Sequence, residues 1–180
     1  METLQPNTIK SSAINYGLYL AIILAGSSIL AYVVNLDLLT NFLYGSIIFI
    51  LTIGLAFFSV YKAKKILNGF ITFKQAFTAF FITIALAVFI KVVIDYVLFN
   101  FIDAEAAIIM QEKALDTQVG LLQNFGMSEE QIALAVEAAE DQPNLYSLQS
   151  LLFGLFGSLA FYSIIGLIVA LIMKRNPENA

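Results

Sequence analysis

The stretch that decides the fold is LQSLLFGLFGSLAFYSIIGLIVALIM, residues 148–173, which contains no Asp, Glu, Lys or Arg. A helix that rises about 1.5 Å per residue needs roughly 20 such residues to cross about 30 Å of hydrocarbon. The strands of a membrane barrel would need alternating polar and apolar residues, and this stretch lacks that alternation. It therefore predicts a transmembrane helix.

Three similar runs precede this stretch in the chain. Residues 14–34 and 42–61 contain no Asp, Glu, Lys or Arg, and residues 76–99 contain only Lys91 and Asp95. The first run could instead be a secretory signal peptide, but it is longer than the usual apolar core of about 7–15 residues and has no clear cleavage site. We therefore predict an all-α integral membrane four-helix bundle, a single membrane domain over residues 1–180.

The composition agrees with a membrane protein and excludes several kinds of chemistry. Of the 180 residues, 60% are hydrophobic and 12% are charged, about half the charged fraction of a typical soluble domain. The absence of Cys and His excludes disulfides, thiol nucleophiles, Cys/His metal centres and Ser-His-Asp catalysis. The net charge of -4 gives no general attraction to nucleic acid. We expect no enzyme activity, no cofactor, no metal and no nucleic-acid partner.

The basic residues are distributed unevenly over the connections between spans. If both termini face the cytoplasm, most of the nine basic residues lie on that side: Lys10, Lys62, Lys64, Lys65, Lys74, Lys174 and Arg175. This is the asymmetry that the positive-inside rule describes. Most of the acidic residues lie in the opposite connections. The sequence therefore predicts a multi-pass protein with cytoplasmic N- and C-termini.

The connection between the second and third spans carries turn and cap signals. Asn68-Gly69 is typical of a helix end, because Gly readily adopts the left-handed conformation. Thr72 and Gln75 have the spacing of a capping box, which predicts the start of the third helix. Phe70 lies near the position of a hydrophobic staple, and Phe70, Phe73 and Phe77 fit a lipid interface. The connection could be a ligand loop, but we favour a capped, positively charged turn.

The one long polar segment of the chain covers residues 101–144. Apolar residues recur at roughly helical spacing up to Asn124, and Gly126 then interrupts the pattern. Ser128 and Gln131 form a second candidate capping box, and Pro143 ends the segment. We predict an extracytoplasmic helical hairpin between spans 3 and 4, whose first helix could continue the third span. The hairpin could dock a basic partner, but we favour a solvated amphipathic cap.

Lys91 and Asp95 are the ionisable side chains within a predicted span. Four residues apart on a helix, they share a face and can pair. Ionisable groups inside a membrane are functional candidates by default. Because Lys91 lies only on the order of 13 Å from the helix end, its side chain can reach toward the headgroups. We favour an ion pair that locks helix packing over a proton- or ion-coupling pair in a transporter, and the sequence leaves open whether the pair faces the bundle or the headgroups.

Small residues recur every four positions in two of the predicted spans. They are Gly17, Ala21 and Ala25 in the first span, and Gly154, Ser158, Gly166 and Ala170 in the fourth. This spacing lets helix backbones approach closely in lipid. It predicts a contact between the first and fourth spans, or a dimer face.

The order of these features resembles an uncharacterised family of four-span bacterial membrane proteins, domain of unknown function 4199. The resemblance covers almost the whole chain and rests on the loop signature Gly69-Phe70-Ile71-Thr72-Phe73-Lys74-Gln75-Ala76-Phe77. It would place an acidic residue just before Ala76, where this chain has Gln75. The family implies the four-span topology and an inner-membrane location, and no known activity, cofactor or catalytic residue.

Two functions remain after these exclusions. The first is a non-enzymatic accessory or assembly subunit in the lipid bilayer, with a protein partner or a second copy of the chain. The second is a small transporter or channel component that uses Lys91 and Asp95.

Overall fold

The structure is a computed structural model that describes residues 5–140 and 142–175, and the described chain is all α-helical apart from turns and one isolated bridge. The elements are α1 Gln5–Val34, α2 Asp37–Thr40, α3 Phe42–Ile66, α4 Phe73–Val97, the π-helical turn η1 Leu98–Ile102, α5 Ala104–Asn124, α6 Glu129–Glu140 and α7 Leu148–Met173. Four segments are long and apolar enough to cross a membrane: Ile9–Val34, Phe42–Ile66, Phe73–Ile102 and Leu148–Met173. The predicted all-α membrane bundle is confirmed.

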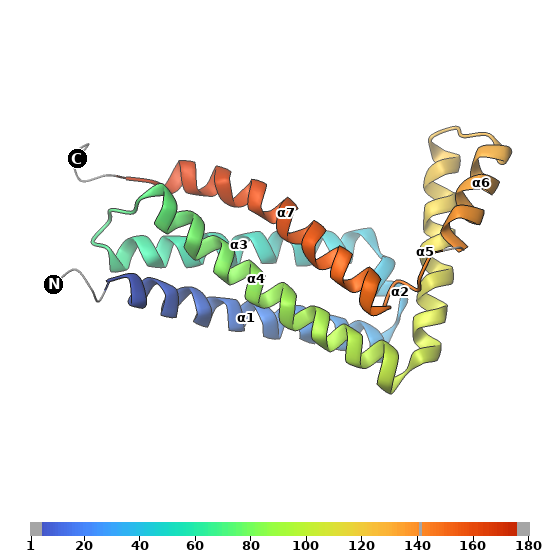
Figure 1. The fold of residues 1–180 in the computed structure, drawn as a ribbon, viewed down its shortest axis with the longest axis horizontal. Coiled ribbons are helices and arrows are strands. Elements are labelled where there is room, and N and C mark those ends of the chain that lie inside the picture. The colour runs from blue at the N-terminus through green and yellow to red at the C-terminus, as the bar shows by residue number, and fades with distance from the viewer. Residues whose placement is uncertain (1–4, 141, 176–180) are drawn as a thin grey trace.

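The four long helices lie side by side with α4 at the centre (Figure 1). Helices α1 and α4 run in one direction, and α3 and α7 run in the other. Helix α4 contacts α1, α3 and α7. Within the described chain, α1 and α7 do not contact each other, because α4 lies between them.

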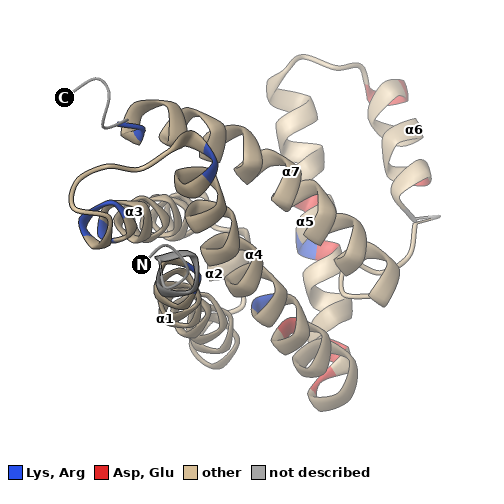
Figure 2. Ribbon diagram, turned by 60° about the vertical axis from the view of Figure 1, so that its left-hand side comes forward, with Lys and Arg blue, Asp and Glu red and all other residues tan. Residues whose placement is uncertain are grey.

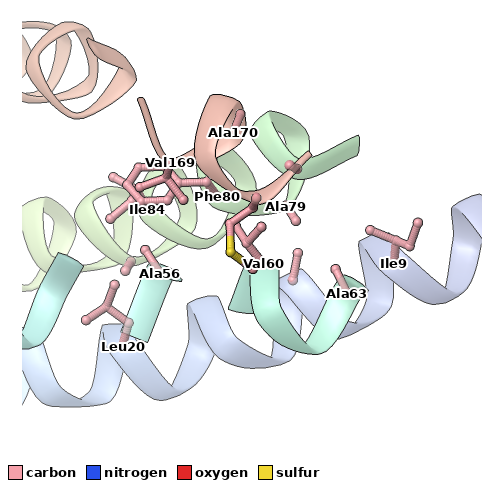
Figure 3. Close-up of a cluster of buried hydrophobic side chains, with 14 of the residues drawn as sticks. Ile9, Leu20, Ala56, Val60, Ala63, Ala79, Phe80, Ile84, Val169 and Ala170 are labelled. Carbon is pink, nitrogen blue, oxygen red and sulfur yellow. The ribbon is translucent and has the colours of Figure 1, made fainter. Parts of the chain in front are cut away.

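The core is built from small and branched apolar side chains at the shared faces of these helices. Figure 3 shows part of it: Leu20, Ala56, Val60, Phe80, Ile84, Val169 and Ala170, all buried. Lipid tails are as apolar as Leu, so the association of such helices depends on close packing. The many buried Ala residues permit that close approach.

One glycine of α1, Gly17, and one of α7, Gly166, both pack on α4. A Cβ added at Gly17 would lie 3.2 Å from the backbone oxygen of Thr83, and one added at Gly166 would lie 2.7 Å from Cδ1 of Phe80. The predicted contact between the first and fourth spans is therefore wrong. The four-residue spacing indicates that a close approach occurs, but both close approaches are made to α4.

The remaining small residues of the predicted pattern differ in their surroundings. Ala21 and Ala170 are buried in the same core, and Ala25 and Ser158 are half-buried. Gly154 is exposed, and a Cβ added there would meet no heavy atom within 4 Å. Within this chain, Gly154 is therefore not a packing residue, and its role in a dimer face stays a prediction.

A buried hydroxyl ties three of the spans together. Oγ1 of Thr83 on α4 lies 3.1 Å from the carbonyl oxygen of Ala13 on α1 and 2.8 Å from Oγ of Ser59 on α3. Thr83 and Ser59 are fully buried. Such interhelical hydrogen bonds contribute about 0.6 kcal/mol on average in membrane proteins. They fix the rotation of α4 against its neighbours.

The third span does not continue into α5. The π-helical turn η1 ends it, and Asp103 has an extended backbone with φ -146° and ψ 85°. Helix α5 then crosses the end of the bundle, and its far half lies beyond α7 together with α6 (Figure 1). The prediction of a continuous helix is wrong, because the Asp103 side chain caps a new helix by accepting a hydrogen bond from the amide of Ala106. We call this end of the bundle the hairpin end.

Candidate functional site

Lys91 and Asp95 form an ion pair on α4 near the hairpin end. The Asp95 side chain is 6% exposed, whereas that of Lys91 is 33% exposed. The pair therefore lies across the boundary of the bundle: the carboxylate points inward and the ammonium group remains accessible at the surface. The sequence had left the direction of these two side chains open.

One oxygen of Asp95 is buried without a hydrogen-bond partner. Lys91 binds Oδ2, while Oδ1 is buried and unpaired, as is Oγ of Ser28 on α1. Ser28 lies one turn before Tyr32, and Asp95 lies one turn before Phe99, whose ring is 6.3 Å from that of Tyr32. Ser28 on α1 and Asp95 on α4 therefore each lie about one helical turn before the contact between Tyr32 and Phe99. Each of the two oxygens can accept a hydrogen bond.

Tyr146 lies beside this polar site. Its ring stacks on Phe99 with centroids 3.8 Å apart. Burial, and after it the negative charge of Asp95, raises the pKa of Tyr146. Its hydroxyl therefore stays protonated over the physiological pH range, so it remains a potential donor near the carboxylate.

Asp103 joins α5 to the first span. Its Oδ1 caps α5, and its Oδ2 accepts a hydrogen bond of 2.9 Å from the hydroxyl of Tyr32 on α1. The amide of Ala106, and after it the Tyr32 hydroxyl, lowers the pKa of Asp103. The carboxylate is thus the form that holds the hairpin in place. The sequence analysis missed this role, although an Asp after an apolar run and before Ala-Glu is a helix-start signal.

Further polar contacts hold the hairpin across the end of the bundle. Asn100 donates a hydrogen bond of 2.8 Å to the carbonyl oxygen of Tyr146, and Asn144 donates one of 3.2 Å to that of Ala107. On the other side, Lys113 of α5 pairs with Asp37 of α2. The hydrogen bond from Lys113, and after it the positive charge, lowers the pKa of Asp37. These pairs could not be predicted because their members are far apart in sequence.

Charge is segregated between the two ends of the molecule (Figure 2). Among the described residues, Lys and Arg gather at the α3–α4 joint, near the start of α1 and at the end of α7, and Asp and Glu gather around α5 and α6. The exceptions are Lys91 and Lys113, each paired with an aspartate. Among the described residues, no group of three or more Asp or Glu could hold a metal ion.

The loop signature connects the α3–α4 joint to the end of α7. Asn68 and Gly69 have φ of 54° and 89°, a left-handed turn after α3. Thr72 and Gln75 form a capping box, in which each side chain bonds the backbone amide of the other residue. Phe73 is exposed at the start of α4.

The end of α7 is held against this joint. Ile71 and Arg175 form an antiparallel bridge with two backbone hydrogen bonds of 3.1 and 2.9 Å. The Arg175 guanidinium lies over the ring of Phe70, 5.6 Å from its centroid. Lys64 donates a hydrogen bond of 3.0 Å to the carbonyl oxygen of Met173. The signature thus has a structural use, which is to fasten the last span to the turn between the second and third.

Two cavities differ in character. One of about 420 Å³ lies along α4 between α1 and α7, where the absence of an α1–α7 contact leaves a groove lined by side chains such as Ile14, Leu86 and Leu155. The other, of about 700 Å³, lies between the hairpin and the start of α7, and glutamine side chains line it. Neither is lined by Lys91 or Asp95.

Comparison with known proteins gives one match. A family model described as protein of unknown function (DUF4199) matches residues 15–175. No curated protein and no solved structure matches the chain.

Proposed function

Because this chain belongs to the DUF4199 family of proteins of unknown function, we propose its role from its own geometry. It is a non-enzymatic accessory or assembly subunit of the inner membrane. Both termini face the cytoplasm, and the α5–α6 hairpin is presented on the opposite side for a protein partner with a basic surface.

The observation that carries this proposal is the acidic surface of the hairpin. Glu112, Asp116, Glu129, Glu130 and Glu137 are all exposed there. The hairpin is fixed to α1, α2 and the start of α7 by the contacts of Asp103, Lys113 and Asn144. An anchored surface of one charge favours a partner of the opposite charge and costs little ordering entropy on binding.

Affinity capture of the chain from native membranes tests whether it binds a partner through the acidic surface of the hairpin. The chain is tagged after Arg175, crosslinked and purified in mild detergent beside a variant in which Glu112, Asp116 and Glu137 are changed to Gln. We expect a partner to co-purify with the first protein and to be lost from the second. A matched control with Gln118, Gln123 and Gln142 changed to Asn keeps the charge and should retain the partner. A monomer without a partner, under several detergents, would contradict the proposal.

The orientation is supported by the charge segregation at the two ends and is tested by cysteine labelling. The natural chain has no Cys, so each introduced thiol reports alone. In intact cells, a membrane-impermeant maleimide should label Gln123→Cys on the hairpin and should leave Ile66→Cys at the end of α3 unlabelled until the membrane is opened. The reverse pattern would overturn the proposed topology.

One observation favours the alternative, a small transporter or channel component. It is the buried, unpaired Oδ1 of Asp95 on α4, together with the buried, unpaired Oγ of Ser28 on α1. A coupling site would make proton or cation flux into liposomes dependent on Asp95, so Asp95→Asn should abolish a flux that Asp37→Asn leaves unchanged. If neither the natural chain nor Asp37→Asn produces flux above that of protein-free liposomes, the transporter alternative is wrong.

A further inference from the structure

The cavity between the hairpin and α7 lies at the level where the last span begins. Its walls are α5, α6, residues 142–145 and the first turns of α7. Phe153, 71% exposed on the apolar span Leu148–Met173, forms one edge of it. Because a span of this composition is surrounded by lipid, the cavity opens toward the headgroup region and the upper acyl chains of the bilayer.

The hairpin overhangs the lipid beside the bundle. Helix α5 crosses the bundle end, and its far half with α6 projects past α7 (Figure 1). On α5 the cavity-lining positions Ala114 and Gln118 continue, at helical spacing, to Leu121 and Phe125, which are 53% and 82% exposed. Acidic Glu112 and Asp116 lie on the opposite face of the helix. Helix α5 therefore has an apolar face that can lie against lipid and an acidic face that points away from it.

The lining of the cavity combines apolar surface with neutral amides. Leu115, Leu145 and Phe153 provide the apolar part, and the side chains of Gln118, Gln142 and Gln149 provide donors and acceptors on three different walls. No Asp, Glu, Lys or Arg is among the described residues that line it. Its volume of about 700 Å³ is within the range of small-molecule sites. Such a lining fits an amphiphile without net charge.

We propose that this cavity binds one bilayer phospholipid with a zwitterionic headgroup that carries a primary ammonium group, of the ethanolamine class. Amide oxygens accept hydrogen bonds from the ammonium group, amide nitrogens donate to the phosphate, and an acyl chain lies along Phe153. A quaternary ammonium group cannot donate these bonds and is usually bound by a cage of several aromatic rings. The described lining has one aromatic side chain, that of Phe153, and so does not form such a cage.

An anionic lipid is disfavoured at this site. Anionic headgroups are recruited by clusters of Lys and Arg. The basic residue of the hairpin, Lys113, is already paired with Asp37. The exposed carboxylates of Glu112, Asp116 and Glu137 give the hairpin a negative field, which repels an anionic headgroup and attracts the ammonium group of a zwitterionic one.

Native mass spectrometry of the full-length protein tests the proposal. Delipidated protein in detergent is mixed with equal amounts of phosphatidylethanolamine, phosphatidylcholine and phosphatidylglycerol, and the adducts are counted. We expect the ethanolamine lipid to be retained at least fivefold above the other two. Ala138→Trp fills the cavity and should remove that preference, while the matched Ala133→Trp, on the opposite face of α6, should keep it.

A second variant makes the test independent of any folding defect in Ala138→Trp. Gln118→Leu/Gln149→Leu changes exposed side chains, so circular dichroism should remain unchanged while the preference for ethanolamine over choline lipid falls to about one. Equal or stronger retention of phosphatidylglycerol would overturn the proposal. So would a preference that survives the double Gln variant, or one that is lost equally in Ala133→Trp and Ala138→Trp.

Discussion

At the scale of single residues, Gly166 has the closest surroundings of the glycines in the described chain, since an added Cβ would lie 2.7 Å from the ring of Phe80. The ring of Phe80 that faces it is almost fully buried between α4 and its neighbours, so a shift of the ring would disturb the surrounding packing. Gly166→Ala should therefore destabilise the bundle by about 1–3 kcal/mol. Gly157→Ala, on the same helix and with no heavy atom within 4 Å, should be neutral or slightly stabilising because Ala favours the helix. Thermal unfolding in one detergent measures both, and equal effects would contradict this packing.

The Lys91–Asp95 pair allows a second test at this scale. Lys91→Met leaves the carboxylate of Asp95 buried without a counter-charge and should cost about 2 kcal/mol of stability, less than for a fully buried pair because Lys91 is partly exposed. Lys91→Met/Asp95→Leu removes both charges and should recover most of the loss. Unfolding by denaturing detergent compares the two variants. A double variant less stable than Lys91→Met would show that the pair itself stabilises the bundle.

The sequence predicts part of what these residues do. The four-residue spacing of Lys91 and Asp95 predicts that they can pair, because i and i+4 share a helix face. It does not predict that Asp95 is buried, since this depends on the rotation of α4, which contacts such as that between Thr83 and Ala13 determine. The unpaired oxygen of Ser28 has no sequence signal at all.

At the scale of elements, the start of α4 depends on its capping box. Thr72→Ala removes the acceptor for the amide of Gln75 and should cost about 1 kcal/mol. Lys74→Ala changes an exposed residue in the same first turn and should have little effect. Thermal unfolding of the two variants in detergent gives the comparison. An unchanged melting temperature for Thr72→Ala would mean that the capping box does not stabilise this joint, and that the backbone bridge between Ile71 and Arg175 is sufficient.

The attachment of α5 should depend on pH through Asp103. Its pKa in the fold lies below the ordinary value of 3.8, so its contribution is complete above that value and is lost as the pH falls through the lowered pKa. The difference in melting temperature between the natural protein and Asp103→Asn should therefore shrink from pH 7 to pH 3. Other carboxylates titrate equally in both proteins, so they cancel in the difference. A difference that grows at low pH would contradict this role.

The elements differ in how well the sequence predicts them. The four long apolar runs predict the spans because membrane thickness sets their length. The caps at Thr72 and Ser128 are local patterns, and both occur in the structure. The break between α4 and α5 was not predicted, because apolar residues continue to Ile102 and one side chain, that of Asp103, ends the run.

At the scale of the whole molecule, the bundle should fold without the hairpin. The end of α4 and the start of α7 are adjacent, since Asn100 bonds the carbonyl oxygen of Tyr146. The core cluster around Phe80 includes no residue of α5 or α6. Replacing residues 104–142 by a Gly/Ser linker of about six residues should leave a monomeric helical bundle by circular dichroism and size-exclusion chromatography. Aggregation in every detergent would show that the hairpin is needed for folding.

The arrangement of the helices could not be predicted from the runs alone. Apolar spans of similar length can pair in several orders, and the small residues of α1 and α7 indicate close packing without naming the partner helix. The central place of α4 follows from its burial on two sides: Phe80 faces Gly166 of α7, whereas Thr83 bonds residues of α1 and α3.

The central place of α4 also has a consequence during synthesis. Helices α1, α3 and α4 contact one another and leave the ribosome before α7, so they can assemble while the later residues are still being made. One flank of α4 then stays uncovered until Gly166 is seated over Phe80 and Arg175 reaches Ile71. A nascent chain interrupted before that moment carries an uncovered α4 flank inside the bilayer, with Phe80 exposed to lipid instead of packed on α7.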